Sequence, residues 1–299
     1  MTTIGRTQSP APVAQGPSRL ARGIRRVALH ASVIGLMVFW LIPTIGLLVN
    51  SFRSADAVSS SGWWNGLLPP TALSLDNYAS VIGQSGIVDA FVNSLFITIP
   101  ATVIPIMVAA FAAYAFSWMN FPGRNILFVA FVGLLVVPLQ TTLIPILRLF
   151  ATLGINGQFL AVWLAHTGYG LPFAVYLLRN FMGSLPREVF ESAAIDGASP
   201  VVSFIRLALP MSIPAIAALA IFQFLFVWND LLVALTYIGA ANSENLPLTV
   251  AVSNLVSSLG DGWQLLGAAA FLSMALPLAV FFALQRYFVR GITGGAVKG

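Results

Sequence analysis

Six polar side chains stand in stretches of the sequence that are otherwise apolar, and they define the chemistry available there. They are Gln140, Thr141, His166, Gln223, Asn229 and Asp230. A polar group in an apolar environment is costly and usually faces another helix or a cavity. Hydrogen bonding between helices is the simpler interpretation of a lone glutamine, threonine or histidine. The alternative is a path for a polar solute, lined by Gln140, His166, Gln223 and Asn229.

Catalysis would require some of these groups to act together. His166 with Asp230 or a serine could form an acid–base pair, but the two residues lie in different apolar segments and no motif connects them. Asp230 also lies near the C-terminal end of its apolar segment, where water can solvate a carboxylate. The absence of cysteine excludes disulfides, thiolate metal sites and cysteine nucleophiles. We expect no catalytic residue and no metal site, so an intramembrane enzyme is the weakest alternative.

A carrier that works alone, driven by protons or ions, is a second alternative. Such a carrier would place charged residues deep in several membrane spans. Here the acidic residues fall in predicted loops or at span boundaries. The chain also has no Gly-x-x-x-x-Gly-Lys-Ser/Thr phosphate-binding sequence. We therefore expect no cofactor on this chain, and any ATP must be bound by a partner.

The polar block at residues 183–210 carries helix start and stop signals at regular spacing. Pro186 and Glu188 suit the first turn of a helix, and Gly197 can end that helix in a left-handed conformation. Ser199 can cap a second helix that Pro200 begins. Pro210 is expected just past its end. The block therefore predicts two short helices.

One face of the first short helix is suited to contact with another protein. Its members share three- and four-residue spacings and are mostly small: Phe190, Ala193, Ala194 and Gly197. Arg187, Glu188 and Glu191 rim that face. We interpret it as a helix that enters a groove on a partner. An amphipathic helix on the lipid surface is the alternative, but such helices carry larger apolar residues and a basic face.

Composition places the elements that hold these groups in a membrane. Of the 299 residues, 58% are hydrophobic and only 8% are charged. So few charges cannot cover a soluble surface, whereas lipid meets most of the outer face of a membrane protein. The net charge of +5 does not indicate nucleic acid, because the basic residues cluster at the ends of apolar segments.

Six apolar windows are long enough to cross a bilayer as helices. They begin near Val27, Ala90, Asn125, Gln158, Pro210 and Leu265. The sequence therefore predicts an all-α membrane protein with six transmembrane helices over residues 27–299. Residues 1–26 predict a disordered basic cytoplasmic tail. A cleaved signal peptide is the alternative, but the apolar run at 27–49 is too long for one.

The distribution of basic residues predicts the orientation, since Lys and Arg are retained on the cytoplasmic side. With the N-terminus inside, only Arg53 and Arg148 lie outside. The cytoplasmic side then holds twelve basic residues: Arg6, Arg19, Arg22, Arg25, Arg26, Arg124, Arg179, Arg187, Arg206, Arg286, Arg290 and Lys298. Both termini and the 183–210 block, between spans four and five, are therefore expected in the cytoplasm.

The same block resembles the cytoplasmic signature of the membrane subunits of binding-protein-dependent ABC importers. That signature is Glu-Ala-Ala, three residues, Gly, nine residues, then Ile, any residue, Leu-Pro. The chain keeps every spacing, with Glu191-Ser192-Ala193, Gly197 and Leu207-Ala208-Leu209-Pro210, and departs from the pattern at Ser192 and Leu207. The resemblance implies a core permease at about 88–290 that couples to a separate ATPase. The coupling residues it implies are Arg187, Glu188, Phe190, Glu191, Ala193, Ala194, Asp196, Gly197, Leu209 and Pro210.

Features elsewhere are similar to the carbohydrate-importing branch, and to the second permease of maltose-type systems. They are Asn77-Tyr78, Asn93-Ser94, the run at 112–116, the run at 121–124, Trp228-Asn229-Asp230 and the glycine-rich ending at 294–299. The resemblance implies a bacterial inner-membrane complex that imports a sugar, with an oligosaccharide as the expected substrate. Its expected partners are a second, homologous permease, an ATPase dimer that binds ATP and Mg, and an external sugar-binding protein.

Two further contacts follow from the resemblance alone. The C-terminal tail, with Gly295, Val297 and Lys298, would reach between the ATPase subunits; a frayed end is the simpler interpretation. The loop at 239–264 would contact the sugar-loaded binding protein; a solvated loop is the alternative. In maltose-type systems the other permease holds most of the sugar, so a sugar ligand on this chain is not implied.

Overall fold

The structure is a computed structural model that describes residues 19–67, 73–83, 86–239, 242, 244–255 and 262–296. Every regular element within those ranges is helical. Four helices are long and apolar enough to cross a membrane: α1 (Arg19–Ser51), α4 (Ile87–Trp118), α7 (Phe159–Met182) and α14 (Trp263–Ala296). The described chain thus has four candidate spans, or six if each of two bent helix pairs is counted as one.

The predicted third span is a sharply bent pair. It consists of α5 (Arg124–Gly133) with the 3-10 turn η3 (Leu134–Val136), followed by α6 (Leu139–Thr152), and the two parts meet at 102°. Val137 is extended, as the residue before a proline tends to be, and Pro138 precedes α6. The predicted third span is therefore two helices joined at a break, and Pro138 stands at that break.

The predicted fifth span is also bent, by 71°. Before the bend lie α9 (Pro200–Ser203), the π-helical η4 (Phe204–Ala208) and α10 (Leu209–Met211). After it lies α11 (Ile213–Trp228), and α12 (Leu232–Ala234) and the π-helical η5 (Leu235–Gly239) follow. The bend falls at Ser212, directly before α11.

The first helix starts earlier than expected. α1 begins at Arg19, so residues 19–26 are helical rather than part of a disordered tail; residues 1–18 lie outside the described chain. Two predicted loops also contain helices. The first holds α2 (Ala55–Ser60), η1 (Trp63–Gly66) and α3 (Asp76–Gly83), and the second holds α13 (Leu248–Ser253).

Arg53 organises the segment that follows α1. Its side chain is 3% exposed, and its guanidinium donates to the carbonyl oxygens of Ala57 at 2.7 Å and Gly62 at 3.1 Å. Asn77 on α3 donates in turn to the carbonyl oxygen of Arg53 at 2.8 Å. A buried charge is tolerated when carbonyl dipoles satisfy it. Arg53, one of the two basic residues predicted to lie outside, therefore holds α1, α2 and α3 together.

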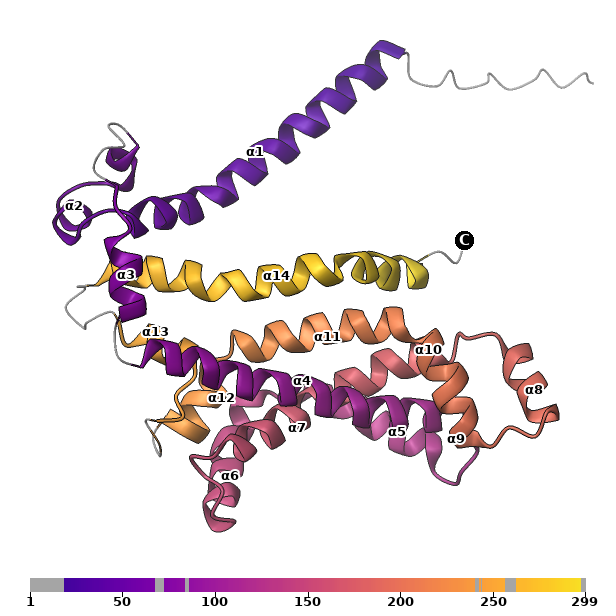
Figure 1. The fold of residues 1–299 in the computed structure, drawn as a ribbon. Helices are drawn as coiled ribbons and strands as arrows, with labels where there is room; N and C mark the ends of the chain where they lie inside the picture. The colour runs from indigo at the N-terminus through magenta and orange to yellow at the C-terminus, as the bar shows by residue number, and fades with distance from the viewer. Residues whose placement is uncertain are drawn as a thin grey trace, which may run out of the picture.

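The core forms where α4 packs along α7, the most extensive helix contact in the described chain. Small buried residues line the contact, including Ala109 and Ala113 on α4 and Ala165 and Ala174 on α7. Small side chains let membrane helices approach closely. α11 packs against both α4 and α14, while α1 leans away from the bundle (Figure 1). The short helix α8 (Arg187–Ile195) lies at one end of the bundle, and α2, α3 and α13 lie at the other (Figure 1).

Candidate functional site

The first short helix of the 183–210 block forms as the sequence predicts. α8 spans Arg187–Ile195, directly after Pro186 and with Glu188 in its first turn. Gly197 takes the left-handed conformation at φ +80°, and the Ala198 amide donates to the carbonyl oxygen of Ala193 at 2.9 Å. Glycine adopts this conformation without steric cost. The prediction that Gly197 ends the helix is confirmed.

The second short helix starts as predicted but ends later. The Ser199 hydroxyl accepts a hydrogen bond from the Val202 amide at 3.4 Å, and Pro200 begins α9. Helical backbone then continues through η4 and α10 to Met211, so Pro210 lies inside the helical run and the predicted end before it is wrong. In the wider π-helical turn the Leu209 amide donates to the carbonyl oxygen of Phe204. That turn accommodates Pro210, which has no amide hydrogen to contribute.

Phe190 faces the bundle, not a partner. Its ring is 8% exposed and stacks on the indole of Trp118, with ring centroids 3.9 Å apart and planes inclined by 21°. Trp118 ends α4, and its Nε1 donates to the carbonyl oxygen of Met182 at the end of α7 at 3.1 Å. The expectation that Phe190 forms part of an outward docking face is therefore wrong. It anchors α8 to the ends of α4 and α7.

A second aromatic contact anchors the following turn. The Phe204 ring in η4 lies 4.8 Å from that of Phe111 and 5.2 Å from that of Tyr114, both on α4. Leu209 also packs against the cluster of buried residues that α4 and α7 contribute to the core. Phe204 and Leu209 are therefore placed to hold the loop rather than to meet a partner, while Pro210 is exposed.

The outward surface of the 186–210 loop mixes charged and apolar side chains. Ala193 is half-buried. The exposed members of the predicted coupling set are Arg187, Glu188, Glu191, Ala194, Asp196, Gly197 and Pro210. Sequence reasoning missed the apolar part: Ile195 is 87% exposed, Val201 65% and Ile205 54%. Ile195 follows Phe190 by five residues, so it lies on a different face of α8. That spacing could have indicated from the sequence that Ile195 is exposed. Such a surface fits the contact of a helix with a protein groove.

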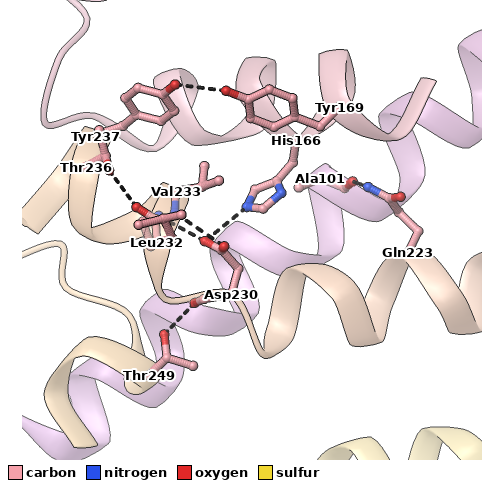
Figure 2. Close-up of polar contacts among 11 residues, drawn as sticks. Ala101, His166, Tyr169, Gln223, Asp230, Leu232, Val233, Thr236, Tyr237 and Thr249 are labelled. Atoms are coloured by element: carbon pink, nitrogen blue, oxygen red, sulfur yellow. Dashed lines mark hydrogen bonds and ion pairs between the residues drawn. The ribbon is translucent and has the colours of Figure 1, made fainter. Parts of the chain in front are cut away.

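A buried polar contact connects α7 to the break after α11. His166 on α7 is fully buried, and its Nε2 lies 3.7 Å from Oδ2 of Asp230 (Figure 2). The Asp230 carboxylate also accepts from the amides of Val233 at 3.3 Å and Ala234 at 3.0 Å, so it caps α12. From the sequence, no motif connected His166 with Asp230, and water was expected to solvate the Asp230 carboxylate. The structure instead joins them, and both carboxylate oxygens are occupied by the α12 cap.

Tyrosine hydroxyls form a second polar chain beside this contact. The Tyr169 hydroxyl on α7 lies 3.0 Å from that of Tyr237 on η5 (Figure 2). Thr142 on α6 donates to the Tyr169 hydroxyl at 3.0 Å. Tyr237 is fully buried. These residues were not singled out from the sequence, because tyrosine in an apolar segment is also an ordinary packing residue.

The four predicted path residues do not form one group. Gln223 on α11 is 6% exposed, and its Nε2 donates to the carbonyl oxygen of Ala101 on α4 at 3.1 Å (Figure 2). His166 and Gln223 thus lie within the packing of α4, α7 and α11. Asn229 is exposed and donates to Leu225 of its own helix at 2.8 Å, and Gln140 is exposed on α6.

The structure describes only part of the C-terminal tail that was predicted to contact the ATPase. α14 continues to Ala296, so Gly295 lies in a helix rather than in a frayed tail. Val297 and Lys298 lie outside the described residues.

Helices of membrane-crossing length, joined by buried polar contacts and followed at one end by a folded loop, are typical of a multi-pass membrane protein. Among known families, residues 85–294 match the binding-protein-dependent transport system inner membrane component. The match covers more than half of the chain, so the chain belongs to this family. The family is a transport component, and the ATPase of such systems is a separate partner.

Individual relatives agree with this assignment. The chain is 54% identical over 277 residues to the osmoprotective compounds uptake permease GgtD of Synechocystis, covering 92% of this chain and 93% of that protein. It is 40% identical to the alpha-glucoside transport system permease AglG of Rhizobium meliloti, covering 91% of this chain and 97% of that protein. The fold matches a chain of a bacterial ABC transporter that imports alginate, with a TM-score of 0.77 and 20% identity, covering 92% of this chain and all of that one.

Proposed function

We propose that this chain is one of two permeases in an ABC importer of an uncharged sugar, an α-glucoside or a related oligosaccharide. Its likeness over nearly its full length to an alpha-glucoside permease supports that substrate class. A trehalose permease of Mycobacterium tuberculosis, 29% identical over 93% of the chain, also supports an uncharged sugar as the substrate. The second permease of the complex is a homologous chain that completes the path across the membrane.

The observation that carries the mechanism is the anchoring of the 186–210 loop. Its outward surface is open, while Phe190 and Phe204 fix it to α4 through Trp118 and Tyr114. A partner ATPase dimer, which binds ATP and Mg, docks on the outward surface. When the dimer closes, the groove that holds α8 moves, and the aromatic anchors transmit the movement to α4 and α7. This rigid connection is what coupling requires, since packed elements transmit displacement.

Sidedness follows from the distribution of charge. The 186–210 loop and the C-terminal end of α14 lie at the same end of the bundle (Figure 1), and that end carries most of the basic residues. We place it, with both termini, on the cytoplasmic side of a bacterial inner membrane. The opposite end, with α2, α3 and α13, receives the external sugar-binding protein. Gly295, Val297 and Lys298 would then be near the ATPase.

Purification of the whole complex tests this function. A tag on this chain should recover an ATPase with a phosphate-binding loop, together with a second multi-pass permease. In liposomes the complex should import radiolabelled maltose or trehalose at the expense of ATP. Glu191→Arg and Ala193→Leu should abolish sugar-stimulated ATP hydrolysis, whereas Asn125→Asp, exposed at the same end of the bundle, should not. Uptake by the purified chain alone, without an ATPase, would contradict the proposal and favour a stand-alone carrier.

A further inference from the structure

A small hollow lies between α7 and α11, one helical turn along α7 from His166. Its volume is about 260 Å³, and its lining residues are Tyr169, Gly170, Phe173, Leu219, Phe222, Gln223 and Phe226. Most of these side chains are aromatic and none carries a charge. Ligand sites are commonly apolar hollows with one or a few well-placed polar groups. The composition of this lining therefore fits an uncharged ligand with apolar faces.

The aromatic rings at the hollow are held in fixed orientations and are still partly exposed. Phe173 is 41% exposed and Phe226 46%. The Phe173 ring meets that of Phe222 at 83° with centroids 6.5 Å apart, and Phe226 meets His166 at 88° and 5.7 Å. Edge-to-face contacts of this kind are favourable for aromatic rings. Phe173 and Phe226 therefore present partly exposed ring surface in the lining of the hollow.

Gln223 supplies a polar group that is fixed in place. Its Nε2 is committed to the carbonyl oxygen of Ala101, which sets the orientation of the amide. No hydrogen bond within the described residues uses its Oε1. Gly170 makes room for the amide, because a Cβ at that position would stand 2.6 Å from Oε1. The hollow thus contains one oriented acceptor with unused capacity.

We propose that this hollow is a sugar subsite on the translocation path, in which the apolar face of a pyranose ring lies against Phe173 and Phe226 and a sugar hydroxyl donates to Oε1 of Gln223. This inference rests on the proposed function and adds that this subunit itself contacts the sugar. A charged solute would find no opposite charge among the lining residues. An acyl chain would leave the Gln223 oxygen without a partner. A sugar satisfies both the rings and the amide.

The number of sugar molecules imported per ATP hydrolysed tests the subsite. The whole complex in liposomes, with its binding protein saturated with maltose or trehalose, is compared with Phe173→Ala and Gln223→Leu. Loss of one contact of ordinary strength should lower the ratio by about tenfold while ATP hydrolysis persists. Phe173→Tyr should restore the ratio. Phe282→Ala removes a ring that is 61% exposed on α14 and is not among the residues that line this hollow, so it should leave the ratio unchanged.

A second measurement does not depend on which sugar is carried. The chain has no cysteine, so Phe173→Cys introduces a single thiol, provided that cysteines in the other subunits are replaced. A charged methanethiosulfonate reagent should modify this thiol in the assembled complex, and a transported sugar should slow the reaction. Absence of reaction would mean that lipid or the second permease covers the hollow, and it would overturn the subsite.

The outcomes separate this inference from the proposed function. If the wild-type complex imports neither maltose nor trehalose, the proposed α-glucoside substrate fails, whatever the variants do. If the wild type imports sugar but Phe173→Ala and Gln223→Leu keep the wild-type ratio, only the subsite fails. An equal loss in Phe282→Ala would also overturn it, because the effect would then not be specific to the hollow.

Discussion

The Phe190 ring stacks on the Trp118 indole at 3.9 Å and joins the loop between the fourth and fifth predicted spans to the end of α4. Trp118 is in turn hydrogen-bonded to the last turn of α7. The two helices that pack most extensively on one another are therefore both attached to α8 through one aromatic pair. A displacement of α8 would therefore move this pair, and in the proposed function the stack is the mechanical link between the ATPase and the bundle.

Removal of the stack should uncouple the complex. In Phe190→Ala the aromatic pair is lost, which removes about 1 kcal/mol of specific stacking in addition to the buried area. We expect the complex to assemble and to keep basal ATP hydrolysis, while stimulation by the sugar-loaded binding protein falls by about fivefold, the ratio that corresponds to about 1 kcal/mol. Phe190→Tyr keeps the ring and should retain stimulation. Full stimulation in Phe190→Ala would show that the stack does not transmit the movement.

Gly170 and Gly168 on α7 form a matched pair. A Cβ at Gly170 would press on the Gln223 amide, whereas one at Gly168 would meet nothing within 4 Å. Gly170→Ala should therefore displace Gln223, break its bond to Ala101 and lower sugar uptake severalfold. Gly168→Ala should transport normally. Uptake measured at equal amounts of membrane-inserted protein compares the two, and equal uptake would show that the position of Gln223 has no role.

The cap on α12 makes a prediction about stability. Asp230→Ala removes both acceptors for the Val233 and Ala234 amides, which should cost about 1 kcal/mol, the usual value for a helix N-cap. Asn can also cap a helix, so Asp230→Asn should lose less. The thermal inactivation midpoint of the detergent-purified complex should fall in the order wild type, Asn, Ala. If the Asn and Ala variants are equally unstable, the contact with His166 would matter more than the cap.

Features encoded by local sequence were predictable, and features that depend on distant contacts were not. Gly197 ends α8 and Ser199 caps α9 because both effects act within one turn of backbone. The stack of Phe190 on Trp118 joins residues far apart in the chain, and so does the contact of His166 with Asp230. No periodicity in the sequence specifies such pairs.

The spans show the same division. Hydropathy located all the apolar segments, because the cost of exposing polar backbone to lipid is set by composition and length. The size of the 102° bend at Pro138 could not be predicted from the presence of a proline alone, because Pro100 and Pro105 lie within the continuous helix α4. Whether a proline breaks a membrane helix depends on neighbours that satisfy the freed backbone groups. Those neighbours are set only by the tertiary fold.

Ile195 provides the most direct test of the docking surface, because it is 87% exposed on α8 and the native chain has no cysteine. Ile195→Cys can carry a photoactivated crosslinker in a complex whose other subunits lack cysteine. We predict a crosslink to the ATPase subunit, with Asn125→Cys as the control that forms none. A thiol at Ile195 that forms no crosslink to the ATPase, and that reacts with a membrane-impermeant reagent added outside intact cells, would contradict the account.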